Sequence, residues 1–329
     1  MDSHLFRLLK TRYSQLGGLR LVREYARMGL LWPGVKTAIR YPFSRETYKQ
    51  VYFDTVRKVE PYLVEQYRPL MRQRCQELKG VELEHKHSKT IWFCWLQGLE
   101  NAPEIVKVCH RSLERYLGSI GYEIVVIDER NWRSYVELPD YVIRRRERRQ
   151  IPPAHFADLL RLELLIRYGG TWIDSTVLCT GFKFQDSGLR LLEADLFMFQ
   201  YTRPGSDKWE GIGNWFISAS TNNEVLMVLR DMLYAYWREH DCVLSYYLFH
   251  LFFSMLREVY PDEIAAMPYA YAPRSLALVK HWGRAFDEER WQRLVSRVCF
   301  HKLTYMADKV PERVKGTYYE HIINNNDNE

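Results

Sequence analysis

A strongly apolar helix is predicted over residues 153–168, with the sequence PAHFADLLRLELLIRY. Leucine and isoleucine fall on almost every side of it, which is typical of a buried helix. Two charged residues, Asp158 and Arg161, stand three positions apart on one ridge of the same helix. Because buried charges need partners, we expect these two either to form a structural ion pair or to be offered to a ligand.

A glycine pair and a short strand follow this helix. Gly169 and Gly170 are suited to end it and turn the chain. Residues 171–174 then predict a strand whose last residue is Asp174, followed by Ser175. The carboxylate therefore stands at the carboxyl end of a strand, where ligands gather in open α/β sheets.

An α/β pattern surrounds these elements. A strand over residues 90–95, a helix over 104–117 and a strand over 122–128 predict a βαβ unit with parallel strands. Further strands are expected at 195–200 and 214–220, and further helices at 222–240 and 242–258. We predict an α/β fold with a Rossmann-type mixed sheet flanked by helices.

The first 87 residues predict a basic helical N-terminal region. Its helical segments are 4–12, 19–31 and 43–79, the last interrupted at Pro61 and Pro69. Residues 1–80 hold 16 Lys and Arg against 7 Asp and Glu, whereas the remainder holds 31 against 34. This excess favours an anionic membrane surface as a partner, and a solvated basic face is the other interpretation. No nucleic-acid-binding module is recognised, so nucleic acid is not expected.

Composition places the chain inside the cell. The six cysteines are scattered without a CxxC pair, which indicates neither a zinc site nor a disulfide framework. We find no secretory signal, and the longest apolar run is too short to cross a bilayer. We therefore expect a cytoplasmic protein, peripheral on the inner face of the cytoplasmic membrane. Aromatic residues make up 15% of the chain, a share that suits clefts in which sugars stack.

The candidate chemistry is that of a nucleotide sugar. Asp174 can face a ribose or a divalent cation, and Mg²⁺ or Mn²⁺ neutralises a leaving diphosphate well. Trp92 and Trp95, at the end of the first strand, are suited to stack on a base or to fill the core. The arginine-rich run 144–149 is either an exposed helix face or a loop that holds an anion. Walker, GxGxxG and GxSxG motifs are missing from the sequence. Their absence excludes three classes of protein: P-loop nucleotidases, dinucleotide-binding proteins and α/β-hydrolases.

Several stretches together resemble the capsular polysaccharide synthesis protein family, a group of DXD-type sugar transferases. The resemblance covers about residues 88–305, and residues 1–87 lie outside it. The matching stretches are the Trp-containing strand, Gln97 and Gly98, Ala102 and Pro103, residues 155–170, TWIDSTV at 171–177, residues 214–216 and residues 301–305.

The resemblance implies a GT-A fold and retaining transfer of a sugar, with UDP-hexose as the expected donor. It implies that Asp158 and Arg161 bind the donor sugar and that Asp174 belongs to the DXD motif, which handles ribose and metal. The expected donor-binding set is completed by Gly170 before Asp174, Ser175 after it, and the two tryptophans Trp92 and Trp95. The catalytic residues are then Asp158, Arg161 and Asp174.

The sequence departs from the DXD pattern at one position. Thr176 stands where the second acid is expected, which weakens the case for the Mn²⁺ or Mg²⁺ cofactor. His301 is the candidate for a late metal ligand beside Asp174, although a structural role is equally open to it, as it is to His250 and His281.

The sequence thus predicts three regions: 1–87, a transferase domain over 88–310, and a tail over 311–329 with a disordered end. The predicted function is transfer of a sugar from a nucleotide donor onto a growing capsular or other surface polysaccharide, on a glycan or lipid-linked glycan acceptor. The alternative is a catalytically degenerate nucleotide-sugar-binding protein, or a scaffold of polysaccharide assembly. The enzyme interpretation predicts that Asp174→Ala abolishes transfer and leaves thermal stability nearly unchanged.

Overall fold

A computed structural model describes residues 18–30, 32, 45–182, 187–203, 205–206, 208–306 and 314–325. The helix expected over residues 4–12 lies outside them. The chain divides into two compact units. The first comprises Met1–Val81, Glu137–Leu159 and Glu224–Pro261, and the second comprises Glu82–Val136, Leu160–Asn223 and Asp262–Glu329.

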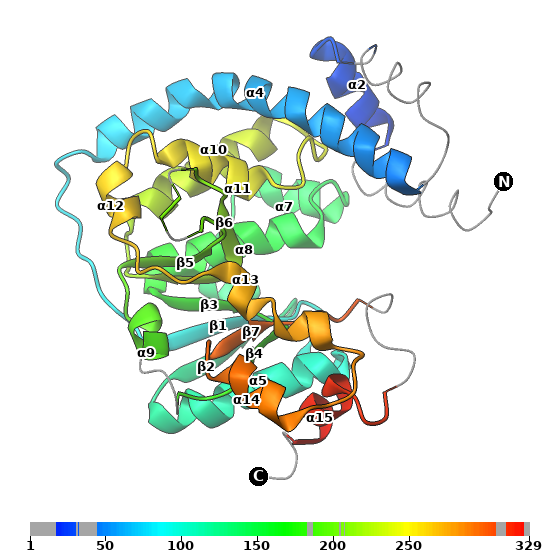
Figure 1. The fold of residues 1–329 in the computed structure, drawn as a ribbon. Helices are drawn as coiled ribbons and strands as arrows, with labels where there is room; N and C mark the ends of the chain where they lie inside the picture. The colour runs from blue at the N-terminus through cyan, green and yellow to red at the C-terminus, as the bar shows by residue number, and fades with distance from the viewer. Residues whose placement is uncertain are drawn as a thin grey trace. The chain divides into compact units, whose positions relative to one another are not determined.

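A mixed five-stranded sheet forms the second unit, in the order β2-β1-β3-β6-β5 (Figure 1). The strands are β1 (Thr90–Cys94), β2 (Glu123–Ile127), β3 (Gly170–Asp174), β5 (Leu196–Gln200) and β6 (Ile212–Ala219). β1 runs parallel to both β2 and β3, whereas β6 runs antiparallel to β3 and β5. A separate antiparallel pair joins β4 (Val177–Cys179) to β7 (Phe300–Lys302). The predicted mixed sheet with flanking helices is confirmed.

The helices of the second unit alternate with its strands along the chain, and α5 lies between the parallel strands β1 and β2, as expected of a βαβ unit. They are η1 (Leu99–Asn101), α5 (Glu104–Tyr116), η2 (Gly118–Ile120), α6 (Trp132–Tyr135), α9 (Ser187–Leu192), α12 (Pro261–Ala265), α13 (Ala272–Ser275), η3 (Leu278–His281), α14 (Glu288–Val295) and α15 (Tyr318–Asn325). The boundary between the two units falls inside α8 (Pro153–Tyr168), and another falls at the start of α12.

The core of the sheet follows from the alternation of side chains along β1. Ile91 and Phe93 join a buried cluster that includes the apolar side of α5. Trp92 points to the other face, where it packs against Tyr135 and Tyr168 and is only 3% exposed. Its indole nitrogen donates a hydrogen bond to the carbonyl of Gly169, over 2.9 Å. Trp92 is therefore a core residue, and its expected role in stacking on a donor base is wrong.

The first unit is helical and contains α2 (Leu19–Arg27), α4 (Arg45–Leu78), α7 (Asp140–Glu147), α10 (Glu224–Glu239) and α11 (Leu248–Leu256). The expected interruption of α4 at its prolines is wrong, since the helix continues through both. Val59, Leu63 and Tyr67 recur every four residues as a buried stripe, while Pro61 and Pro69 are exposed. Packing of that stripe in a unit shared with α10 and α11 outweighs the missing proline donors.

The two compact units do not decide the expected division into residues 1–87, 88–310 and 311–329, which stays a prediction. The described N-terminal helices, α2 and α4, share one compact unit with residues 137–159 and 224–261. The expected tail contains α15, whose Tyr318 and Ile322 are buried in the same core cluster as α5. Aromatic and aliphatic side chains at helical spacing anchor this segment.

The turn between α8 and β3 depends on Gly170. We predict that substitution of Gly170 by alanine has a steric cost that the same substitution at Gly121 lacks. Both residues have a left-handed φ, 90° and 89° respectively. A Cβ at Gly170 would lie 2.3 Å from the carbonyl oxygen of Thr90, whereas a Cβ at Gly121 would meet nothing within 4 Å. Gly121→Ala should therefore cost about 1–2 kcal/mol of stability through backbone strain alone.

Gly170→Ala should lower the midpoint of chemical denaturation clearly more than Gly121→Ala, because it adds the clash with the β1 backbone. Equal losses for the two variants would contradict a packing role for Gly170.

Candidate functional site

The carboxylate of Asp174 lies at the carboxyl end of β3 and meets three donors. The indole nitrogen of Trp172 donates to Oδ1 over 2.9 Å, and the Lys302 ammonium donates to Oδ2 over 3.0 Å. A guanidinium nitrogen of Arg161 stands 3.5 Å from Oδ1. The Asp174 side chain keeps 27% of its surface exposed, so it remains open to a ligand while two cations hold it.

Arg161 is fixed from several directions. Its side chain is only 6% exposed, and its Nη1 donates a hydrogen bond to the carbonyl oxygen of Asn214 on β6. The guanidinium carbon lies 4.9 Å from the ring centre of Trp172, within range for a cation–π contact. The prediction of a buried helix over residues 153–168 is confirmed by α8. That burial makes the position of the Arg161 charge rigid.

Lys302 reaches the site from β7. Its ammonium donates to the hydroxyl of Thr176 over 2.6 Å as well as to Asp174. β7 pairs with β4, and Lys302 stands opposite Val177 in that pair, which brings it beside the residues that follow β3. The Thr176 side chain is buried, whereas Lys302 keeps 22% of its side-chain surface exposed. The ammonium therefore sits where the carboxylate, the threonine hydroxyl and solvent meet.

The pKa of Asp174 is lowered from its ordinary value. Burial by itself favours the neutral acid and would raise the pKa, but the positive charges of Lys302 and Arg161 outweigh it. Hydrogen bonds from Trp172 and Lys302 act in the same direction as those charges. Asp174 is consequently an anion at neutral pH.

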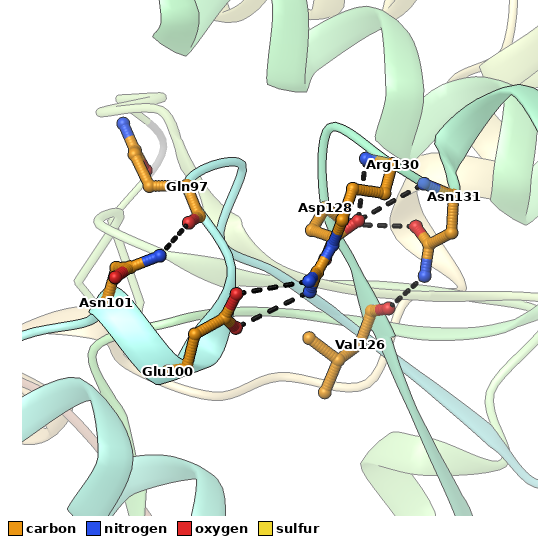
Figure 2. Close-up of polar contacts among 7 residues, drawn as sticks. All are labelled: Gln97, Glu100, Asn101, Val126, Asp128, Arg130 and Asn131. Carbon is orange, nitrogen blue, oxygen red and sulfur yellow. Dashed lines mark hydrogen bonds and ion pairs between the residues drawn. The ribbon is translucent and has the colours of Figure 1, made fainter.

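A second carboxylate, Asp128, follows β2 at the same edge of the sheet and is engaged by its own loop (Figure 2). It accepts hydrogen bonds from the backbone nitrogens of Arg130 and Asn131 and from the Arg130 side chain. Hydrogen bonding from Arg130 is the largest cause that lowers the pKa of Asp128.

Arg130 also reaches Glu100, over 3.2 Å, and so ties the loop after β2 to the loop after β1 (Figure 2). The Asp128 network therefore shapes the edge of the sheet, and Asp174 is the better candidate to receive a ligand.

The remaining predicted donor-binding residues occupy varied positions. Asp158 is buried and lies one turn before Arg161 on α8, on the first unit's side of the boundary. Ser175 is half-buried in the turn after Asp174, and Gly170 begins β3 pressed against β1. Trp95 follows β1 and is half-buried, with its ring 5.1 Å from that of Tyr305. Of the two tryptophans, Trp95 alone remains a candidate to stack on a base.

His301 does not accompany Lys302 to Asp174. Neighbouring side chains in a strand point in opposite directions, so His301 faces away from the carboxylate that Lys302 contacts. Its Nε2 lies 3.3 Å from the Thr180 hydroxyl. Burial lowers the pKa of His301 to about 4, so the ring is neutral at physiological pH. The expected use of His301 as a metal ligand next to Asp174 is therefore corrected to a buried structural role.

The residues at Asp174 do not fit a divalent cation. Mg²⁺ takes oxygen ligands at about 2.0–2.1 Å in a near-octahedral shell and Mn²⁺ favours similar donors, whereas this position offers one carboxylate and one hydroxyl. The Lys302 ammonium already contacts both oxygens and would repel a second cation. Among the residues that the structure describes, no group of three or more His, Cys, Asp and Glu could hold a metal.

Two contributors to this site were missed by reasoning from the sequence, Lys302 and Trp172. Within the matching stretch 301–305, the sequence leads to His301 and not to the adjacent Lys302. A three-residue strand gives no alternation long enough to show which of two neighbours faces the site. The contact of Trp172 with Asp174 follows from strand alternation, because residues two apart share a face.

The comparisons place the chain in a family. The family model described as capsular polysaccharide synthesis protein matches residues 40–322, which is most of the sequence, and the chain belongs to that family. The match begins well before residue 88, so the expectation that residues 1–87 lie outside the resemblance is wrong for residues 40–87. Family membership supports a glycosyltransferase as the class of protein.

One solved structure that is similar to this chain is the PaToxG glycosyltransferase. It has 15% sequence identity and a TM-score of 0.38, with 63% of this chain and 82% of that chain covered. No curated protein sequence matches the chain.

In the part of the chain that the structure describes, no helix is long and apolar enough to cross a membrane.

We predict that Asp174 and Lys302 are energetically coupled, to be measured by a double-mutant cycle with Asp174→Asn and Lys302→Met. A coupling of about 1–2 kcal/mol in unfolding free energy is expected, because both groups are half-buried and hydrogen-bonded. The exposed pair of Glu289 and Arg293 on α14 is the matched control and should give about 0.5 kcal/mol or less. Since the pKa of Asp174 is lowered in the folded state, its contribution should be complete at neutral pH.

That contribution should be lost only as the pH falls below the ordinary carboxyl value and through the lowered pKa of Asp174. A coupling no larger than that of the control pair would contradict the proposed arrangement. Asp174→Ala is also expected to cost stability, contrary to the expectation from sequence, because it removes an acceptor that Arg161 and Lys302 share.

Proposed function

We propose that this protein is a retaining glycosyltransferase that moves a hexose from a nucleotide donor, with UDP-hexose the favoured donor, onto a growing capsular or other surface polysaccharide. The acceptor in this proposal is a glycan or lipid-linked glycan. Membership of the capsular polysaccharide synthesis protein family supports the biological setting. The site around Asp174 supports the chemistry.

One observation carries the proposal: an ionised carboxylate lies between a buried guanidinium and an ammonium at the carboxyl end of a central strand. Such edges are where nucleotides and sugars bind in open α/β sheets. A carboxylate accepts hydrogen bonds from sugar or ribose hydroxyls, and a cation attracts phosphate oxygens. The same small area thus offers both kinds of recognition that a nucleotide sugar needs.

Each residue of the site has a separate role in the proposed reaction. Arg161 and Asp158 orient the donor sugar, and Asp174 accepts a hydroxyl of the ribose or sugar. In the reaction, a bond forms between the acceptor oxygen and the anomeric carbon, while the bond from that carbon to the β-phosphate oxygen breaks. The electron pair leaves with the nucleoside diphosphate. The acceptor proton passes to a phosphate oxygen on the same face of the sugar, which needs no separate protein base.

We predict that Arg161→Lys lowers kcat/KM for release of UDP from UDP-hexoses by about 10- to 100-fold, because lysine lacks the planar fork that holds Asp174, the Asn214 carbonyl and the Trp172 ring together. Asp174→Asn should cause a comparable loss. Arg167→Lys, an exposed arginine on the same helix, is the matched control and should keep full turnover.

Equal activity of Arg161→Lys and Arg167→Lys would refute the proposed site. If the wild type binds UDP-hexoses but neither hydrolyses nor transfers them with capsular oligosaccharide acceptors, the binding-protein or scaffold alternative replaces the enzyme.

We further propose that the protein docks on the inner face of the cytoplasmic membrane through its basic N-terminal region. Within that region, α2 exposes Leu19 and Val22, which are 82% and 37% accessible, beside the exposed Arg23 and Arg27. Apolar side chains next to arginines are typical of helices that lie in an anionic lipid surface.

Docking predicts that the protein sediments with phosphatidylglycerol vesicles at low salt and is released at high salt, because each basic residue contributes about 1 kcal/mol through a screened attraction. Leu19→Glu with Val22→Glu should weaken this binding about tenfold or more. Val81→Glu, at another exposed valine of the first unit, is the control. Equal sedimentation of both variants would contradict docking through α2.

A further inference from the structure

We infer that Lys302 takes the place of the divalent cation at this donor site, so that its ammonium, and not a metal ion, contacts the diphosphate of the nucleotide donor. The inference rests on the proposed function, because it assumes that the site receives a nucleotide sugar. It names Lys302 as the residue that contacts the leaving group, a role that the donor set at Asp174 does not allow a metal to fill.

Position is the first argument. The resemblance implies that Asp174 belongs to the DXD motif, and Thr176 stands where the second acid of that motif is expected. The Lys302 ammonium stands 3.0 Å from the carboxylate of Asp174 and 2.6 Å from the hydroxyl of Thr176. One positive group therefore already contacts the side chains at both positions of the motif.

Chemistry of the threonine is the second argument. A second carboxylate at position 176 would balance the two charges of a metal ion, whereas the hydroxyl of Thr176 adds no charge. The Lys302 ammonium offsets the single negative charge of Asp174 and hydrogen-bonds to both side chains, so no negative charge is left over for a metal ion to balance. The chain thus has a threonine in place of the second acid and, beside it, a lysine from β7 in place of the cation.

Donor capacity is the third argument. An ammonium has three N–H donors, of which Asp174 and Thr176 receive two. In the described part of the chain the third is available for a phosphate oxygen, and the 22% exposure of the side chain gives that oxygen access. Lysine binds phosphate as a point charge, and a charge-assisted hydrogen bond strengthens as negative charge develops on the leaving oxygen.

The surroundings hold the ammonium in place. Lys302 is the last residue of β7. Phe300 in the same strand and Leu303 just after it are buried in the core, and the Leu303 backbone nitrogen donates a hydrogen bond to the Thr176 carbonyl over 2.7 Å. The backbone on both sides of the side chain is therefore fixed relative to Thr176. A pre-organised charge of this kind needs little rearrangement when the diphosphate binds or leaves.

The test is titration calorimetry of the full-length protein with UDP and with GDP, in EDTA and in Mn²⁺. The wild type should bind one of them with the same Kd, within about twofold, in both buffers. Lys302→Met should raise that Kd about tenfold or more, since it removes a charge-assisted hydrogen bond. Lys302→Arg should retain most of the affinity, and Lys280→Met, at an exposed lysine of the second unit, should leave it unchanged.

A gain-of-function variant sharpens the test. Lys302→Ala combined with Thr176→Asp restores two acids and removes the ammonium, so its nucleotide binding should become dependent on Mn²⁺. Manganese alone, followed by electron paramagnetic resonance, should bind this double variant and leave the wild type unoccupied at the site.

The other outcomes are decisive. Binding by the wild type only in Mn²⁺ overturns the inference and leaves the proposed function intact, as does binding in EDTA that Lys302→Met does not weaken. If neither nucleotide binds in either buffer, the proposed donor chemistry itself fails. Should Lys302→Met not fold, Lys302→Gln takes its place, because it removes the positive charge and keeps a hydrogen-bond donor for Asp174 and Thr176, and it should raise the Kd in EDTA in the same way.

Discussion

The site depends on one electrostatic constraint: an ionised carboxylate at the end of a central strand must be stabilised in a half-buried position. Burial alone would favour the neutral acid, and the charges of Lys302 and Arg161 reverse that preference. Each cation comes from a different element, α8 or β7, and each is held by further contacts. Asp174 is therefore the point at which the helix, the main sheet and the small β4–β7 sheet are joined electrostatically.

This constraint explains why α8 contains a buried arginine at position 161. A helix as apolar as α8 would be simpler without Arg161, whose burial is costly unless it is paired. The pairing with Asp174, the carbonyl of Asn214 and the ring of Trp172 offsets that cost and fixes the guanidinium in one orientation. A rigid charge beside an open carboxylate is of more use to ligand binding than to stability.

The parts of this account that the sequence predicted are those with local signals. The apolar periodicity of α8, the glycine pair and the strand that ends on Asp174 all lie within one continuous stretch, and the βαβ unit before it is equally local. Lys302 was missed because it lies 128 residues from Asp174 and meets it only through pairing of β4 with β7. No periodicity can reveal such a contact.

Other differences have equally physical causes. Pro61 and Pro69 are common helix breakers, but in α4 they lie on the exposed side of a buried stripe, where packing compensates for the missing donors. The position of Trp92 near the end of its strand fits either stacking on a base or filling the core, and alternation turns its side chain into the core. The sequence shows which strands reach the edge of the sheet, whereas the face that each side chain occupies depends on packing.

The most direct measurement is a crystal structure of the full-length protein with whichever of UDP or GDP binds, grown in excess Mn²⁺ and recorded at the manganese absorption edge. The account predicts a diphosphate oxygen within hydrogen-bonding distance of the Lys302 ammonium and no anomalous peak at Asp174. A manganese peak in contact with the Asp174 carboxylate, with Lys302 displaced from it, would contradict the account.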